Sequence, residues 1–272
     1  SATARWIALL AAAMLVVSTL PVQAEPERHH PRPLSVNPLY AEGFVLYQLN
    51  CAVCHGEKGQ GDGPSARHFL PRPQDFTRGV YKLRSTPSGS LPLDSDLTRT
   101  IEHGISRTAM APWGMRLSCA EIAEVVKVVK SFSPRFLVHA PQAPVPVPPA
   151  PDRSLELILR GRELYARERC TACHGEFGRG DGPSVASLSD DRGISIRPHD
   201  FTMSGGVKAG PRAEDIYRSL STGLDGTPMH DADRLSPEDR WALVYFLMVL
   251  SEQPSPDIDP GGSQSFIGQR LA

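Results

Sequence analysis

Two copies of the pentapeptide Cys-x-x-Cys-His constrain this chain more than any other feature of its sequence. They occupy residues 51–55 and 170–174. The spacing is typical of covalent c-type haem attachment, in which two thiols bond to the porphyrin and the adjacent imidazole binds the iron. A redox dithiol would not need the histidine, and a zinc site would need four ligands gathered in one place. The sequence therefore predicts two separate haem sites.

Each predicted site has its own set of covalent and iron ligands. Four cysteines are expected to hold two covalently bound haem c groups: Cys51, Cys54, Cys170 and Cys173. His55 and His174 are expected to bind the two irons on one side. The fifth cysteine, Cys119, lies outside both motifs, so no disulfide framework is predicted.

The two motifs belong to a longer internal duplication. Residues 55–65 match residues 174–184 in glycine, aspartate, proline and serine positions. Further on, the tripeptide Asp-Phe-Thr at 75–77 recurs at 200–202, which requires a six-residue insertion in the second copy. Repeats of this size, each with its own cofactor motif, indicate tandem domains.

The domain organisation follows from the repeat and from composition. The sequence predicts a signal peptide at 1–24, a first domain at 38–139, a proline-rich linker at 140–152, a second domain at 153–252 and a flexible tail at 253–272. A proline-rich linker favours an extended polyproline II spacer. We expect it to separate the domains without fixing their orientation.

The N-terminus has the pattern of an export signal. Arg5 precedes an apolar run at 7–17, and the small residues of 22–24 end in Ala24 before a polar segment. We expect cleavage after Ala24 and a periplasmic mature protein. The alternative is an uncleaved anchor, for which the run is shorter than the roughly 20 residues that cross a bilayer.

The coarse pattern within each copy is helical, so an all-α fold is predicted. Helices are expected around Gly43 and Tyr47, and around Gly161 and Tyr165, where the glycine would permit another helix to cross closely. Shorter helices are expected at 95–103 and 213–221, and closing helices begin at the capping residues Ser118 and Ser236.

The second iron ligand on each haem is predicted to be a methionine. Met110 and Met229 stand at the same separation from His55 and His174, each in a Gly-x-x-x-Thr-x-Met pattern. A thioether ligand raises the reduction potential of the haem. Competing ligands remain: Met115, Met203, His103, His199 and His230.

These residues carry a resemblance to a known family. Each half resembles a class I c-type cytochrome domain, and the whole resembles the tandem dihaem cytochromes c. The resemblance implies that the first and last helices of each domain cross. It also implies that a proline carbonyl, of Pro64 or Pro183, accepts a hydrogen bond from the iron-binding histidine. Trp113 has no counterpart in the second copy, so the two haems are expected to differ in potential.

The expected function is electron transfer. The net charge of −1 shows no excess of basic residues of the kind that nucleic-acid-binding proteins use. The basic segment 72–84 is expected to bind haem propionates or an acidic partner, or else to carry solvated loop charges. We expect a periplasmic carrier, not an enzyme, that passes single electrons between redox partner proteins. It would act as a shuttle or as the cytochrome subunit of a dehydrogenase or reductase complex. Its expected partners include a membrane-bound respiratory complex.

Two alternatives to a carrier remain. A dihaem peroxidase or sulfur-compound oxidoreductase needs an open or displaceable iron position or a reactive cysteine, for which Cys119 is the candidate. A gas-binding sensor needs an accessible iron. No catalytic residue is predicted.

Overall fold

A computed structural model describes residues 41–203 and 207–252 of the chain. The predicted signal peptide, the beginning of the first domain and the predicted C-terminal tail lie outside these residues. Within the described ranges the regular structure is helical, and extended pairing is limited to two isolated bridges, Ser189 with Ser195 and Val207 with Gly210. The all-α fold is therefore confirmed. Across those same ranges, every helix is too short or too polar to span a lipid bilayer.

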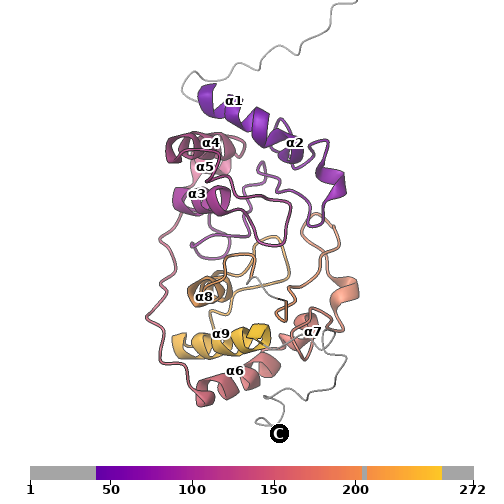
Figure 1. Cartoon of the computed structure of the whole chain (residues 1–272), viewed down its shortest axis with the longest axis vertical. Helices are drawn as coiled ribbons and strands as arrows, with labels where there is room; N and C mark the ends of the chain where they lie inside the picture. The colour runs from indigo at the N-terminus through magenta and orange to yellow at the C-terminus, as the bar shows by residue number, and fades with distance from the viewer. Residues whose placement is uncertain (1–40, 204–206, 253–272) are drawn as a thin grey trace, which may run out of the picture. The chain divides into compact units, whose positions relative to one another are not determined.

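Each helix described in the second repeat has a counterpart in the first, in the same order, and the first repeat has one further short helix (Figure 1). The first repeat has α1 (Ala41–Asn50), α2 (Ala52–His55), α3 (Asp94–His103), α4 (Cys119–Ser131) and a final short helix α5 (Arg135–Val138). The second has α6 (Leu155–Arg167), α7 (Thr171–His174), α8 (Ala213–Thr222) and α9 (Pro237–Glu252). A 3-10 turn follows each Cys-x-x-Cys-His motif, at Ala66–His68 and Val185–Ser187. The long segments between these helices are irregular.

The expected caps fix where the closing helices begin. Ser118 Oγ accepts a hydrogen bond from the Glu121 amide, and the Glu121 carboxylate accepts one from the Ser118 amide, a reciprocal capping box. In the second repeat Ser236 Oγ accepts from the Asp239 amide. Because α4 starts directly after its cap, Cys119 lies exposed in the first turn of this helix.

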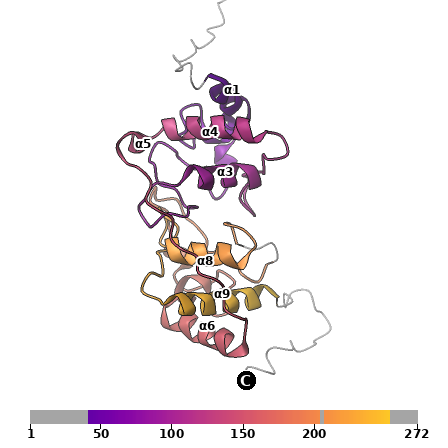
Figure 2. The ribbon, with the colours of Figure 1, turned by 90° about the vertical axis from the view of Figure 1, so that its left-hand side faces the viewer.

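In each repeat the closing helix, α4 or α9, lies between the two other long helices of that repeat. Figures 1 and 2 show α4 between α1 and α3, and α9 between α6 and α8. Glycines permit the close crossings: a Cβ atom on Gly43 would lie 2.5 Å from the Glu124 carbonyl oxygen, and one on Gly161 would overlap the Ala242 carbonyl oxygen. The predicted crossing of the first and last helices is therefore confirmed.

Replacing Gly161 with valine is expected to lower the free energy of unfolding by about 2–3 kcal/mol, because the new side chain meets rigid backbone of α9. Chemical denaturation followed by far-ultraviolet circular dichroism measures the loss. Glu163→Ala, on the exposed side of the same helix, is the control and should change little. An unchanged midpoint for the valine variant would show that the helices do not cross at this glycine.

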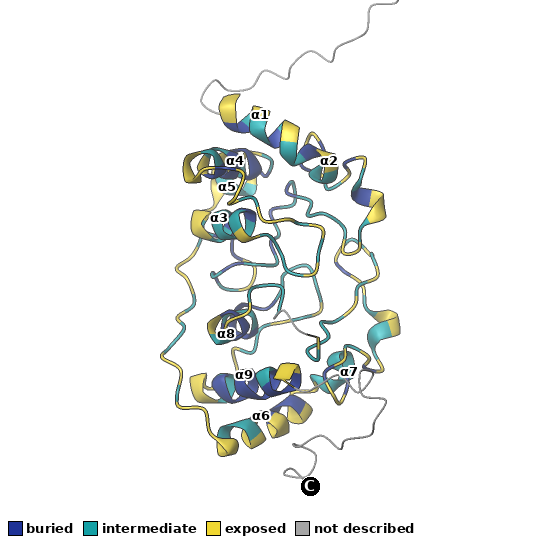
Figure 3. Cartoon of the chain, in the orientation of Figure 1, coloured by how far each residue is buried: buried dark blue, intermediate teal, exposed yellow. Residues whose placement is uncertain are grey.

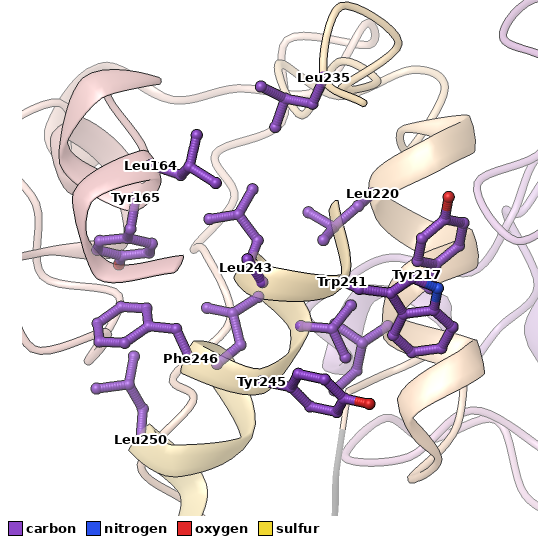
Figure 4. Packing of buried hydrophobic residues seen from close by; sticks show 14 residues of the cluster. Leu164, Tyr165, Tyr217, Leu220, Leu235, Trp241, Leu243, Tyr245, Phe246 and Leu250 are labelled. Atoms are coloured by element: carbon purple, nitrogen blue, oxygen red, sulfur yellow. The ribbon is translucent and has the colours of Figure 1, made fainter. Parts of the chain in front are cut away.

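Each repeat has its own hydrophobic core. The closing helices supply most of it, and burial in Figure 3 is concentrated on α4 and α9. Figure 4 shows the second core, in which the rings of Trp241 and Tyr217 lie 4.7 Å apart between α9 and α8. The first core is built around Tyr47, Ile122 and Val125. Separate cores agree with two domains, while the precise domain boundaries stay a prediction.

The proline-rich linker contacts both repeats, which differs from the free spacer expected from its composition. The Val145 amide donates to the Ser85 carbonyl oxygen at 2.8 Å, and the Gln142 amide donates to Ser90 Oγ at 3.0 Å. Val147 packs against the second core. Prolines lack an amide donor, so the non-proline residues provide the linker's anchoring hydrogen bonds.

Side chains of the basic segment 72–84 also reach the second repeat. The Arg84 side chain is fully buried, and its Nη2 donates to the Thr222 carbonyl oxygen at 2.7 Å and to the Asp225 carboxylate at 2.8 Å. Arg78 pairs with Asp191 at 2.7 Å. The sequence predicted an external acidic partner, a cofactor or solvent for these cations. The acidic partners of Arg78 and Arg84 instead lie within the same chain.

Candidate functional site

Each Cys-x-x-Cys-His motif forms one turn of helix. Cys51 immediately precedes α2, and its carbonyl oxygen accepts from the amides of Cys54, at 3.1 Å, and His55, at 2.9 Å. Cys170 has the same position before α7. Residues three apart in such a turn lie on the same side, so the two thiols of each motif can reach one ligand. No disulfide links any of the five cysteines, all of which lie within the described residues.

Protonation of the thiols argues against a redox dithiol. Burial raises the pKa of Cys51 to about 11, and burial likewise raises the pKa of Cys170 to about 11. A redox-active dithiol depends on a thiol whose pKa is lowered, since the thiolate is the reactive form. The first cysteine of each motif therefore lacks the lowered pKa on which disulfide exchange depends.

The two histidines have a defined orientation. His55 Nδ1 lies 3.1 Å from the Gln74 carbonyl oxygen, and His174 Nδ1 lies 3.1 Å from the His199 carbonyl oxygen. A carbonyl oxygen only accepts, so Nδ1 is the donor in both rings and Nε2 keeps its lone pair. Burial lowers the pKa of both imidazoles, which favours the neutral form that binds a metal.

The structure corrects the predicted acceptor for these histidines. Pro64 and Pro183, expected from the family resemblance, are exposed and do not accept the bonds. The physical reason is the fold of the loop after each motif. The Phe76 amide donates to the Gly59 carbonyl oxygen at 2.7 Å, which brings the Asp-Phe-Thr segment, and Gln74 before it, over the imidazole.

The repeated Asp-Phe-Thr tripeptide proves to support the histidine ring. The Phe76 ring stacks on His55 with centroids 4.6 Å apart, and the equivalent pair in the second repeat lies at 4.8 Å. The Asp75 carboxylate accepts from the Thr77 amide and hydroxyl, which holds the turn. The repetition was visible in the sequence, but its contact with the histidine depends on the folded loop.

The Gly-x-x-x-Tyr pattern ties the first helix of each repeat to the motif. Tyr47 Oη donates to the Gly56 carbonyl oxygen, and Tyr165 Oη donates to the Gly175 carbonyl oxygen, both at 2.8 Å. Each accepting glycine directly follows the iron-binding histidine candidate. The crossing of first and last helices is thereby linked to the position of that histidine.

The two methionine loops have the same hydrogen-bonding pattern. The Met110 amide donates to Thr108 Oγ1 at 3.1 Å, and its carbonyl oxygen accepts from the Ile105 amide at 2.9 Å. The Met229 loop repeats both bonds, at 3.2 and 2.8 Å. Both methionines are half-buried against the core of their own repeat. They remain the predicted second ligands.

The competing ligands lie in less suitable places. Met115 is 96% exposed, and Met203 is also exposed. His103 and His230 are exposed at the surface. His199 already contributes its carbonyl oxygen to His174, and its ring packs edge-on against Phe201 at 5.2 Å. Burial lowers the pKa of His199 to about 4.

Buried polar atoms test whether a haem fits these repeats. Tyr81 Oη in the first repeat, and Arg240 Nε and Trp241 Nε1 in the second, are buried and have no hydrogen-bond partner among the described residues. Such donors need acceptors, and a haem supplies two carboxylates together with a large apolar ring. No group of three or more potential metal-binding side chains gathers within 41–203 or 207–252, as a zinc site would require. The donor set and the unpaired donors therefore fit haem.

Comparison with known families supports this cofactor independently. Residues 158–251 match the family "Cytochrome c", and residues 38–127 match "Cytochrome C oxidase, cbb3-type, subunit III". The two matches fall on successive repeats.

Two individual proteins are similar to most of the chain. The "Cbb3-type cytochrome c oxidase subunit FixP" of Azorhizobium caulinodans is 28% identical over 220 residues, covering 77% of this chain. The aligned region spans 59% of that relative's length. A chain in the solved "reducing HAO-like protein complex Kustc0457/Kustc0458" of Kuenenia stuttgartiensis is 44% identical, with a TM-score of 0.75. That likeness covers 77% of this chain and 96% of the other.

In each repeat the helical fold, the Cys-x-x-Cys-His motif and one of the two family matches all indicate a cytochrome c domain. The chain accordingly belongs to the c-type cytochromes, as a tandem dihaem protein in which each of two cytochrome c domains carries a covalently bound haem c.

Proposed function

We propose that this cytochrome transfers single electrons in the periplasm as a subunit or close partner of a larger respiratory oxidoreductase. A bound haem supplies an iron that alternates between ferric and ferrous states. The thioether positions are assigned to Cys51, Cys54, Cys170 and Cys173, and the iron ligands to His55, Met110, His174 and Met229.

The observation that carries the proposal is the identical architecture of the two methionine loops. Both loops hold their methionine through the same threonine and main-chain bonds. A site closed by protein on both sides of the iron is suited to passing electrons without binding substrate. The oriented imidazoles add to this, because their lowered pKa favours the neutral form that binds iron.

The association with a larger enzyme is supported by the similar proteins. Both similar proteins are components of assemblies by name, one a cytochrome c oxidase subunit and the other a chain of an HAO-like protein complex. The periplasmic location rests on the export pattern of residues 1–24 and on c-type haem attachment. The enzyme alternative finds no support at Cys119, which lies exposed on α4 and belongs to neither methionine loop.

Replacement of either methionine tests the carrier assignment. Met110→Ala and Met229→Ala are each expected to open one iron, so that the spectrum of that haem becomes high-spin and the reduced protein binds about one equivalent of carbon monoxide rapidly. The reduction potential of the altered haem should fall because thioether ligation raises it.

Met115→Ala is the matched control, since this side chain is almost wholly exposed. It should keep two low-spin haems. Rapid carbon monoxide binding by the unaltered protein, or peroxide turnover lost in Met229→Ala, would contradict the carrier assignment and favour an enzyme.

A further inference from the structure

We propose that the two repeats exchange arginines, so that each repeat positions the iron-binding histidine of the other. Arg192 of the second repeat acts on His55, and Arg107 of the first repeat acts on His174. The inference rests on the proposed role of these histidines as iron ligands. Both arginines are positioning residues, because they bond to the backbone that holds the imidazole and not to the imidazole itself.

The contact on the first histidine runs through two consecutive carbonyl groups. Arg192 Nη1 donates to the Pro73 carbonyl oxygen at 3.2 Å. The next carbonyl oxygen, of Gln74, accepts from His55 Nδ1 at 3.1 Å. An anchored Pro73 limits the movement of the Gln74 peptide, which in turn limits rotation of the imidazole.

The six-residue insertion predicted in the second repeat explains how Arg192 reaches this place. The buried Asp190 carboxylate accepts from the Arg192 amide at 2.9 Å, from the Ile194 amide at 2.9 Å and from Arg192 Nε at 3.3 Å. These bonds close a compact loop and direct the guanidinium outward from it. The first repeat has no such insertion and so offers no equivalent arginine.

The same loop also contacts the methionine loop of its own repeat. The Asp191 amide donates to the Gly226 carbonyl oxygen at 2.9 Å, while the Asp191 carboxylate pairs with Arg78 of the first repeat. The insertion therefore bridges the histidine side of the first site and the methionine side of the second. A bridge of this kind provides a physical connection between the two iron environments.

The reciprocal contact comes from the first methionine loop. Arg107 Nη1 donates to the Asp200 carbonyl oxygen at 3.2 Å, one residue beyond the His199 carbonyl that accepts from His174. Arg107 has a φ of +61°, a conformation that favours glycine, and the corresponding residue of the second repeat is Gly226. An arginine in this strained position is consistent with a use for its side chain.

A crossed pattern of effects is the expected result. In Arg192→Gln, solvent exchange of the His55 Nδ1 proton, measured by nuclear magnetic resonance on the dihaem protein, should accelerate about tenfold while that of His174 stays unchanged. In Arg107→Gln the effect should fall on His174 alone. Arg192→Lys should rescue only part of the change, because lysine lacks the planar fork of donors.

Arg162→Gln is the matched control, an exposed arginine on α6. Equal acceleration at both histidines would reveal general loosening, and no acceleration would show that the arginines are irrelevant; either result overturns the inference. Paramagnetic shifts in the same spectra test separately whether His55 and His174 bind iron. Resonances of His55 and His174 that lack the paramagnetic shifts of ferric haem would overturn the proposed function, while the exchange rates would still decide the role of the arginines.

Discussion

Arg84→Leu is expected to reduce the free energy of unfolding by about 3–5 kcal/mol, the loss typical of breaking a buried ion pair by removing one partner. The Arg84 side chain is fully buried, and Asp225 is largely buried. The substitution removes donors from the Thr222 and Tyr81 carbonyl oxygens as well as from the carboxylate. Denaturant titration of the dihaem protein, followed by haem absorbance, measures the loss.

The expected damage is concentrated at the second site although the changed residue lies in the first repeat. Asp225 stands between Gly223 and Met229, and it also accepts from Ser88 Oγ and the Gly89 amide. Arg84→Lys keeps the positive charge but lacks the planar set of guanidinium donors. It should therefore lose less free energy of unfolding than Arg84→Leu. A loss below about 0.5 kcal/mol in Arg84→Leu would indicate that the contact between the repeats is not formed in solution.

The double variant Cys170→Ser, Cys173→Ser is expected to retain one covalent haem instead of two. Serine cannot form the thioethers, so intact-protein mass spectrometry should find a mass lower by one haem. The absorbance per polypeptide should fall by about half. The reciprocal variant, Cys51→Ser with Cys54→Ser, should lose the other haem.

Cys119→Ser serves as the control for both, because Cys119 lies in neither motif, and it should keep two haems. Two haems in either double variant would refute the assigned attachment sites. Loss of both haems from one of the double variants would instead show that attachment of haem at one site depends on attachment at the other.

The two sites are not equivalent, and one of their differences lies directly after the shared methionine loop. Trp113 packs against the first core, with the Arg116 guanidinium 5.7 Å from its ring centroid. The second repeat has no tryptophan there. Polarity near a haem affects its potential, so unequal potentials for the two haems remain the expectation.

Local sequence was sufficient for several features of this protein. The attachment motifs, the capping box at Ser118 and the Gly-x-x-x-Tyr helices depend on residues within one turn or one short segment, so their spacing is readable directly. The duplication reinforced these predictions, because a pattern that occurs twice is hard to attribute to chance. The cofactor and the all-α fold followed from the same residues.

Only the tertiary structure identified which residues hold the histidines. The acceptors are the carbonyl oxygens of Gln74 and His199, and any residue type offers a carbonyl group, so composition contains no signal for them. Arg84 and Arg192 look like ordinary loop cations in the sequence, and their partners lie more than a hundred residues away. Short-range patterns specify helices and covalent chemistry, whereas contacts between the repeats depend on how two folded surfaces meet, which no local spacing encodes.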